Sequence, residues 1–155
     1  PHLEQAGVTV LLEPLQARVT DVLNTLEDAR AIIEAIGSQR IAGMLDFHNS
    51  QDEREPWERL IAAHADIIRH VHLNEVDGHH PSLVGRPGRA RSTYAAAFRA
   101  LARAEYAGWI SLETFHAPES PETVLAETRA FLDSMASALR GGASGPQGAP
   151  TRGGS

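Results

Sequence analysis

The stretch from residue 8 to residue 46, VTVLLEPLQARVTDVLNTLEDARAIIEAIGSQRIAGMLD, decides the fold class. Its first six residues, VTVLLE, form a short apolar run with β-branched side chains, which favours a strand over residues 8–13. Residues 20–36 repeat apolar side chains at helical spacing, and IAGMLD at 41–46 is a second strand-like run. Gly37 lies between them, where a helix C-terminus favours a left-handed residue. The stretch therefore predicts a strand, a helix and a second strand in succession.

The same alternation continues along the chain. Apolar periodicity predicts helices over residues 56–65 and 93–105, and Ser120 with Pro121 starts a further helix. Strands are expected over residues 70–74 and 109–113, and a helical stub over residues 2–6 precedes the first unit. Four strand–helix units at this spacing favour an α/β fold with parallel strands and right-handed crossovers.

The composition changes near residue 140. Residues 141–155, GGASGPQGAPTRGGS, hold six glycines and two prolines and no large apolar side chain. We therefore expect one domain over residues 1–139 and a disordered Gly/Pro-rich tail over residues 140–155. A chain of 155 residues with 42% hydrophobic content is enough for one packed core.

Charge and composition exclude several classes of protein. Lys and Arg number 14 against 20 Asp and Glu, for a net charge of -6, so neither a nucleic-acid nor a membrane partner is expected. The chain has no cysteine, which excludes disulfides, thiolate nucleophiles and cysteine-ligated metals and favours a cytoplasmic protein. No apolar run approaches the ~20 residues of a membrane span, and no charged-then-apolar leader opens the chain.

Each predicted strand ends in a residue that can bind a metal. They are Glu13 for the first strand, Asp46 for the second, His72 or Asn74, followed by Glu75, for the third, and Glu113 for the fourth. Because side chains alternate faces along a strand, the four point away from the apolar face that meets the helices. They also lie at the carboxyl ends of parallel strands, where α/β proteins place their sites. We therefore expect the four side chains to converge.

Three converging carboxylates repel one another unless a cation joins them. Two Glu, one Asp and one His form a mostly oxygen ligand set, which suits Mn²⁺, Mg²⁺ or Co²⁺. The alternative for each acidic residue alone is a helix N-cap or a solvated loop position. For His79 and His80 we expect solvated loop positions, and for Trp57 helix packing.

The connection from Glu75 to Ser92 is longer than the loops of compact domains usually are, and such loops are commonly functional. It carries polar side chains, among them Asp77 and Arg86, so we expect it to cover a substrate. Its arginines have an alternative interpretation as a solvated basic stretch.

Four segments, in order and one per strand, resemble a known family. They are LLEPL (11–15) with LNT (23–25), MLDFHN (44–49), HVHLNEVDGHHP (70–81) and YAGWISLETF (106–115). Over residues 1–138 they are similar to the second half of the sugar phosphate isomerase/epimerase superfamily. These proteins are xylose isomerase-like TIM barrels and include the ketose 3-epimerases, hydroxypyruvate isomerases and inosose dehydratases.

The resemblance implies the roles of the residues. Glu13, Asp46, His72 and Glu113 match the family's metal ligands, on strands that correspond to the fifth through eighth of the barrel. Glu13 and Glu113 would also be the catalytic acid/base pair, moving a proton next to a carbonyl through an enediolate. The resemblance also implies that His48 contacts the substrate. Glu75, by its position after the third strand, and Asp77 and Arg86, by their place in the long connection, are further candidate substrate-binding residues. The implied substrate is a sugar or a sugar-like molecule, and the implied activity is isomerisation or epimerisation.

This sequence departs from the epimerase pattern at three positions. Only Phe47 separates Asp46 from His48, Val19 stands where a substrate-contacting glutamate is usual, and the family's loop arginine falls near Gly78. Hydroxypyruvate isomerases typically carry Gln where this chain has His72.

A complete barrel needs about 250 residues, so we expect a (βα)4 half of a TIM barrel. A half-barrel leaves two strand edges unpaired, which a truncated chain, a homodimer or a complementing N-terminal half would each explain. The alternative function is a non-catalytic remnant or a metal-binding half-barrel module.

Overall fold

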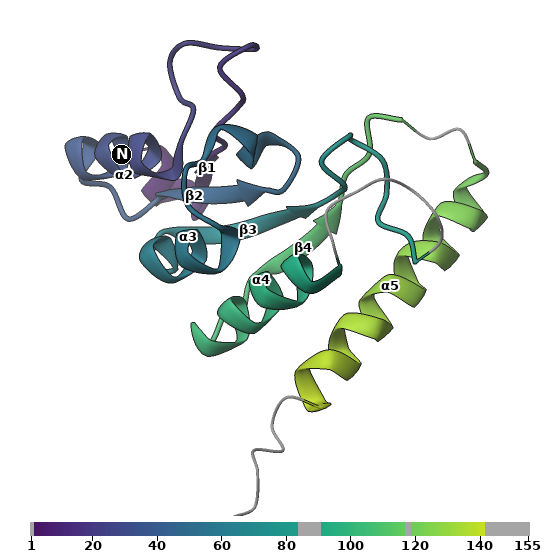
Figure 1. Cartoon of the computed structure of the whole chain (residues 1–155). Coiled ribbons are helices and arrows are strands. Elements are labelled where there is room, and N and C mark those ends of the chain that lie inside the picture. The colour runs from purple at the N-terminus through teal and green to yellow at the C-terminus, as the bar shows by residue number, and fades with distance from the viewer. Residues whose placement is uncertain (1, 84–90, 117–118, 142–155) are drawn as a thin grey trace, which may run out of the picture.

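The chain alternates strands and helices throughout (Figure 1). A computed structural model of the protein describes residues 2–83, 91–116 and 119–141. In chain order the elements are α1 (His2–Ala6), β1 (Val10–Leu12), α2 (Leu26–Ile36), β2 (Ile41–Asp46), the 3-10 helix η1 (Asn49–Asp52), α3 (Trp57–His64), β3 (Ile68–Leu73), α4 (Arg91–Arg103), β4 (Trp109–Leu112) and α5 (Pro121–Gly141).

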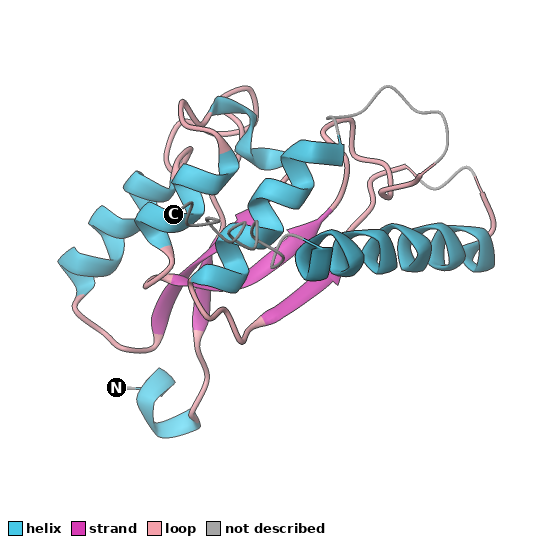
Figure 2. Cartoon of the chain, turned by 60° about the horizontal axis from the view of Figure 1, so that its bottom comes forward, coloured by secondary structure: helices cyan, strands magenta, loops and turns pink. Residues whose placement is uncertain are grey.

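The four strands form one sheet in the order β1-β2-β3-β4, and every neighbouring pair is parallel. The helices α2 to α5 lie along one side of the sheet (Figure 2). The prediction of a parallel α/β fold with four strand–helix units is therefore confirmed. Because all strands run in the same direction, their carboxyl ends meet at one edge of the sheet, where the polar strand ends gather.

An irregularity between β2 and β3 sets the register at this edge. Gly43 pairs with Ile68, but Met44 pairs with His70, so Arg69 has no partner of its own. An extra residue in one strand shifts every later side chain to the other face. As a result His72, rather than Val71, lies opposite Asp46.

A hydrophobic core joins the sheet to the helices. Its largest fully buried members are Trp57, Tyr94, Phe47, Phe131 and Leu26. The rings of Phe47 and Trp57 are 4.3 Å apart, and Tyr94 meets both at T-shaped angles. The expectation that Trp57 serves helix packing is confirmed by its 1% exposure. This core fixes Phe47, which directly follows Asp46.

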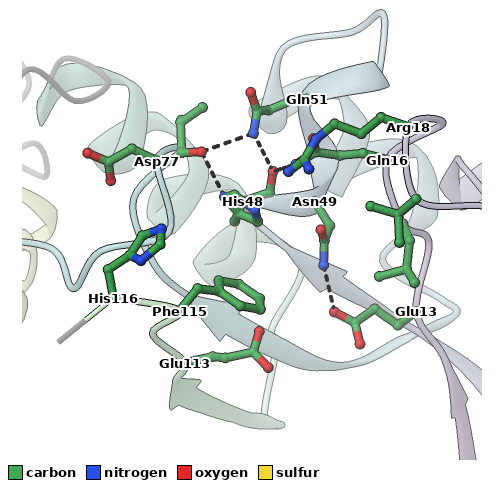
Figure 3. Close-up of a pocket in the computed structure, with 13 residues that line it drawn as sticks. Glu13, Gln16, Arg18, His48, Asn49, Gln51, Asp77, Glu113, Phe115 and His116 are labelled. Atoms are coloured by element: carbon green, nitrogen blue, oxygen red, sulfur yellow. Dashed lines mark hydrogen bonds between the residues drawn. The ribbon is translucent and has the colours of Figure 1, made fainter.

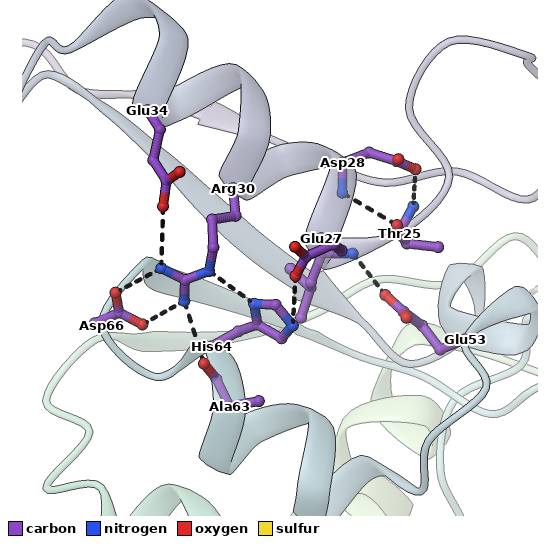
Figure 4. Close-up of polar contacts among 10 residues, drawn as sticks. Thr25, Glu27, Asp28, Arg30, Glu34, Glu53, Ala63, His64 and Asp66 are labelled. Atoms are coloured by element: carbon purple, nitrogen blue, oxygen red, sulfur yellow. Dashed lines mark hydrogen bonds and ion pairs between the residues drawn. The ribbon is translucent and has the colours of Figure 1, made fainter.

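Helix α2 begins later than its periodicity predicts, at Leu26 rather than at residue 20. Thr25 and Asp28 form a capping box, which satisfies backbone donors that would otherwise be unpaired. Glu53, just after η1, accepts a hydrogen bond from the Leu26 backbone N–H at 2.6 Å. Further along, Arg30 holds Asp66 through two nitrogens at 2.6 and 2.9 Å (Figure 4). The Glu53 contact attaches α2 to the segment after η1, and the Asp66 contact attaches it to the turn between α3 and β3.

The expectation of a solvated His80 is wrong. The side chain has no exposed surface, and its Nε2 lies 2.9 Å from a Glu127 carboxylate oxygen on α5. Helix α5 covers this part of the loop and supplies the polar partner that a buried imidazole needs, and periodicity in the loop itself gives no sign of that contact.

Two other expectations fall at the limits of the described ranges. Helix α5 continues to Gly141, two residues into the predicted tail, and residues 142–155 lie outside the described residues. Of the long connection from Glu75 to Ser92, residues 84–90 also lie outside them. None of the helices within the described ranges has the length and apolar composition that a membrane span requires.

Candidate metal centre

Four side chains from the ends of all four strands meet at the carboxyl edge of the sheet. Each of Glu13, Asp46, His72 and Glu113 offers one ligand atom, and the four atoms lie within 4.8 Å of one another. His72 Nδ1 is 3.1 Å from Glu113 Oε2, 3.3 Å from Asp46 Oδ2 and 3.7 Å from Glu13 Oε1. The expected convergence of the strand ends is therefore present, and we call these four residues the carboxylate–histidine cluster.

The cluster contains polar atoms whose bonding is incomplete. His72 Nδ1 and Glu113 Oε2 are buried and have no hydrogen-bond partner. Burial raises the pKa of the Glu113 carboxyl to about 7, assisted by a hydrogen bond with Asp46 and by the Asp46 and Glu13 charges, and opposed by His72. Buried polar atoms without partners are costly, and so are crowded carboxylates. A cation at their centre would remove both costs.

The donor set fits a hard or borderline divalent cation. Three carboxylates and one imidazole match the oxygen-rich sites of Mn²⁺ and Mg²⁺, and they lack the thiolates of structural zinc sites. The residues present therefore fit a divalent metal.

A cavity of about 680 Å³ opens directly in front of the cluster. Glu13 and Glu113 line it from the two outer strands of the sheet (Figure 3). Phe115 and Val76 contribute apolar wall, and His48 and Asn49 come from the segment that follows β2. The lining holds three carboxylates, two imidazoles and an aromatic ring, so the cavity offers both polar and apolar contacts to a small polyhydroxylated molecule.

His48 is held in a defined orientation beside this cavity. Its Nδ1 is 2.7 Å from the Val76 carbonyl oxygen, and its ring lies against Phe115 with centroids 4.9 Å apart. A carbonyl only accepts, so Nδ1 carries the hydrogen and Nε2 is the acceptor of the neutral ring. Gly78 supports the arrangement: its φ is +83°, and a Cβ there would lie 3.1 Å from the Phe115 ring.

The predicted substrate residues separate into three groups. His48 and Asp77 line the cavity. Glu75 is buried and accepts a hydrogen bond from the Tyr94 hydroxyl at 2.9 Å, and it is not among the residues that line the cavity. Arg86 lies outside the described residues.

Sequence reasoning assigned no role to Asn49, Gln16 or Phe115, which all line the cavity. Gln16 is buried and donates to the His48 carbonyl oxygen at 2.8 Å, and Asn49 donates to Glu13. Asn49 closes the MLDFHN segment, so its position right after a predicted ligand strand was the available signal.

Comparison with known proteins gives a consistent match. A family model described as the xylose isomerase-like TIM barrel matches residues 1–135. The chain is 27% identical over 132 residues to 3-dehydro-D-guloside 4-epimerase of Escherichia coli (strain K12), covering 85% of this chain and 46% of the relative. It is 29% identical over 109 residues to ketose 3-epimerase of Arthrobacter globiformis, covering 70% of this chain and 36% of the relative.

Solved structures give the same result. The structure of an L-ribulose 3-epimerase superposes with a TM-score of 0.70 and 26% identity, over 90% of this chain and 51% of the other. The chain therefore spans about half the length, or less, of the relatives that it matches. Its four strands form a partial TIM barrel.

Proposed function

The chain belongs to the xylose isomerase-like TIM-barrel family, and we propose that it carries the metal centre of a divalent-metal-dependent sugar isomerase or epimerase. The observation that carries the proposal is the carboxylate–histidine cluster, with two buried ligand atoms that have no hydrogen-bond partner. Two relatives of the chain bear the names of sugar epimerases, which supports a sugar-like substrate.

The proposed chemistry is proton transfer at a carbon next to a carbonyl. A bound divalent cation supplies an electrophile that stabilises negative charge on the substrate oxygens. The chain itself supplies Glu13 and Glu113, which reach the cavity from β1 and β4 at opposite edges of the sheet. One carboxylate can take a proton from a substrate carbon that lies between them, and the other can return a proton from the opposite side.

Other residues would orient the substrate. With Nδ1 bound to Val76, His48 can accept a hydrogen bond from a sugar hydroxyl through Nε2. Asp77 is exposed at the cavity and can accept from a further hydroxyl, while Phe115 offers an apolar surface to the C–H groups of the sugar. Glu75 and Arg86 remain predictions from their positions in the sequence.

A closed barrel requires four further strand–helix units. We propose that a longer chain, a complementing N-terminal half-barrel or a second copy in a homodimer supplies these units. The sheet face that would meet them is open: Trp109 on the edge strand β4 is 82% exposed.

An alternative class is a non-catalytic metal-binding half-barrel. The observation in its favour is that all four proposed ligands lie within this half, so metal could bind without turnover. Exchange of a substrate proton with solvent distinguishes the two functions, because only an enzyme catalyses it.

The test is solvent deuterium incorporation into a panel of ketoses and keto-glycosides with Mn²⁺ present, followed by NMR. We expect incorporation by the unmodified protein and none by Glu113→Gln. Glu34→Gln is the matched control, because Glu34 is exposed on α2 and is not among the residues that line the cavity. Metal binding without incorporation would favour the non-catalytic module, and equal incorporation by Glu113→Gln would contradict the proposed role of that residue.

A further inference from the structure

Asn74 joins a proposed metal ligand to the segment that carries His48. It follows β3 directly and has no exposed surface. Its Nδ2 donates to both carboxylate oxygens of Asp46, at 3.1 and 3.3 Å. Its Oδ1 accepts the backbone N–H of His48 at 2.8 Å. One buried amide therefore contacts both the cluster and the wall of the cavity.

The orientation of this amide has only one consistent solution. The His48 backbone N–H can only donate, so Oδ1 must face it. Nδ2, which can only donate, then faces the carboxylate oxygens of Asp46. The main chain of Asn74 is held as well, because its carbonyl accepts the hydroxyl of the buried Tyr94 at 2.9 Å.

Asn49 makes a second connection of the same kind. Its backbone N–H donates to Asp46 Oδ1 at 2.7 Å. Its Nδ2 donates to Glu13 Oε1 at 3.1 Å, as Figure 3 shows. Asn49 is 6% exposed. It therefore links the carboxylates that come from β1 and β2, and Asn74 links β2 to the segment that follows it.

We propose that Asn49 and Asn74, here called the amide pair, are positioning residues that hold Asp46 and Glu13 ready for the cation. This inference rests on the proposed function of the cluster. A carboxylate free to rotate must be ordered at the moment of binding, whereas hydrogen bonds from neighbouring groups fix it beforehand. Amide donors carry no charge, so unlike Lys or Arg they orient a carboxylate without competing with the metal for it.

The proposal predicts a loss of metal affinity when either amide is removed. We expect Asn74→Leu, which keeps the branched shape and the number of side-chain heavy atoms, to weaken Mn²⁺ binding by about 10- to 100-fold, the usual effect of deleting a partner of a metal ligand. Asn49→Ala leaves the backbone bond to Asp46 in place, so its effect should fall at the lower end of this range. Both amides contact the ligands and not the cation, so the metal should still bind.

Ser50→Ala is the matched control. Ser50 lies in the same segment, is 7% exposed, accepts the Trp57 indole N–H at 2.7 Å and donates to the Phe47 carbonyl. Its removal breaks buried hydrogen bonds next to Asn49 but removes none that a cluster carboxylate accepts. A loss of stability alone would therefore affect the control and the amide variants alike.

The experiment measures Mn²⁺ dissociation constants for the 155-residue chain and the three variants. Circular dichroism checks folding, and the Co²⁺ absorption spectrum reports the ligand geometry. We expect Asn74→Leu to bind Mn²⁺ more weakly and to show an altered Co²⁺ spectrum. We expect the Mn²⁺ dissociation constant of Ser50→Ala to stay within about twofold of that of the unmodified chain. If Asn74→Leu does not fold, the Mn²⁺ dissociation constant of Asn49→Ala tests the proposal instead.

Amide variants that bind Mn²⁺ as tightly as the unmodified chain would overturn the inference and leave the proposed function standing. Equal weakening in Ser50→Ala would also overturn it. Absence of binding by the unmodified chain would contradict the proposed function, and the inference with it.

Discussion

Acidification from pH 8 to pH 6 should weaken Mn²⁺ binding by the carboxylate–histidine cluster about tenfold. Burial raises the pKa of the Glu113 carboxyl to about 7. With that pKa, about nine tenths of the Glu113 side chains are ionised at pH 8 and about one tenth at pH 6. A carboxyl group must lose its proton before it binds a metal, so the apparent affinity follows the ionised fraction.

The assay is a Mn²⁺ titration at pH 6, 7 and 8 and constant ionic strength, with free Mn²⁺ followed by electron paramagnetic resonance. Glu113→Gln cannot ionise at this position, so it should bind more weakly at every pH and show a smaller difference between pH 6 and pH 8. Wild-type affinities that agree within about twofold across this range would refute the role given to Glu113 as a ligand that must first release a proton.

The two tryptophans should differ sharply in urea unfolding. Trp57→Ala removes a core ring that is 1% exposed and should cost about 3–5 kcal/mol of unfolding free energy, whereas Trp109→Ala removes an 82% exposed ring and should change it by less than about 0.5 kcal/mol. Similar losses for both would contradict the description of the core. Thr25→Ala deletes the N-cap of α2 and should lower the unfolding free energy by about 1 kcal/mol, with Thr123→Ala on α5 as the comparison variant. An unchanged unfolding free energy in Thr25→Ala would count against the observed start of α2.

The alternation of strands and helices could be predicted because the spacing of apolar residues within each segment indicates a strand or a helix. Strand β2 has the predicted bounds, 41–46, and β4 differs from its prediction by one residue. The cluster could also be predicted, because parallel strands bring their carboxyl ends together whatever the details of packing. Glu13, Asp46 and Glu113 needed only the strand ends and the alternation of faces, whereas the choice of His72 over Asn74 also needed the family resemblance.

Features that depend on contacts between distant segments could not be predicted. The start of α2 is decided by the capping box at Thr25, which outweighs the apolar periodicity of residues 20–25. The burial of His80 depends on Glu127, 47 residues away. The role of Asn74 depends on the hydrogen bond that it accepts from the backbone N–H of His48, 26 residues away in the sequence. In each case the local sequence was compatible with a second arrangement.

The presence of one metal ion at the four strand ends is tested most directly by the stoichiometry of Mn²⁺ bound to the 155-residue chain at pH 8. We expect one ion per chain, and we expect Asp46→Asn to reduce the affinity sharply because a buried carboxylate ligand loses its charge. No specific binding, or binding that Asp46→Asn leaves unchanged, would contradict the assignment of the four strand ends to a single metal ion.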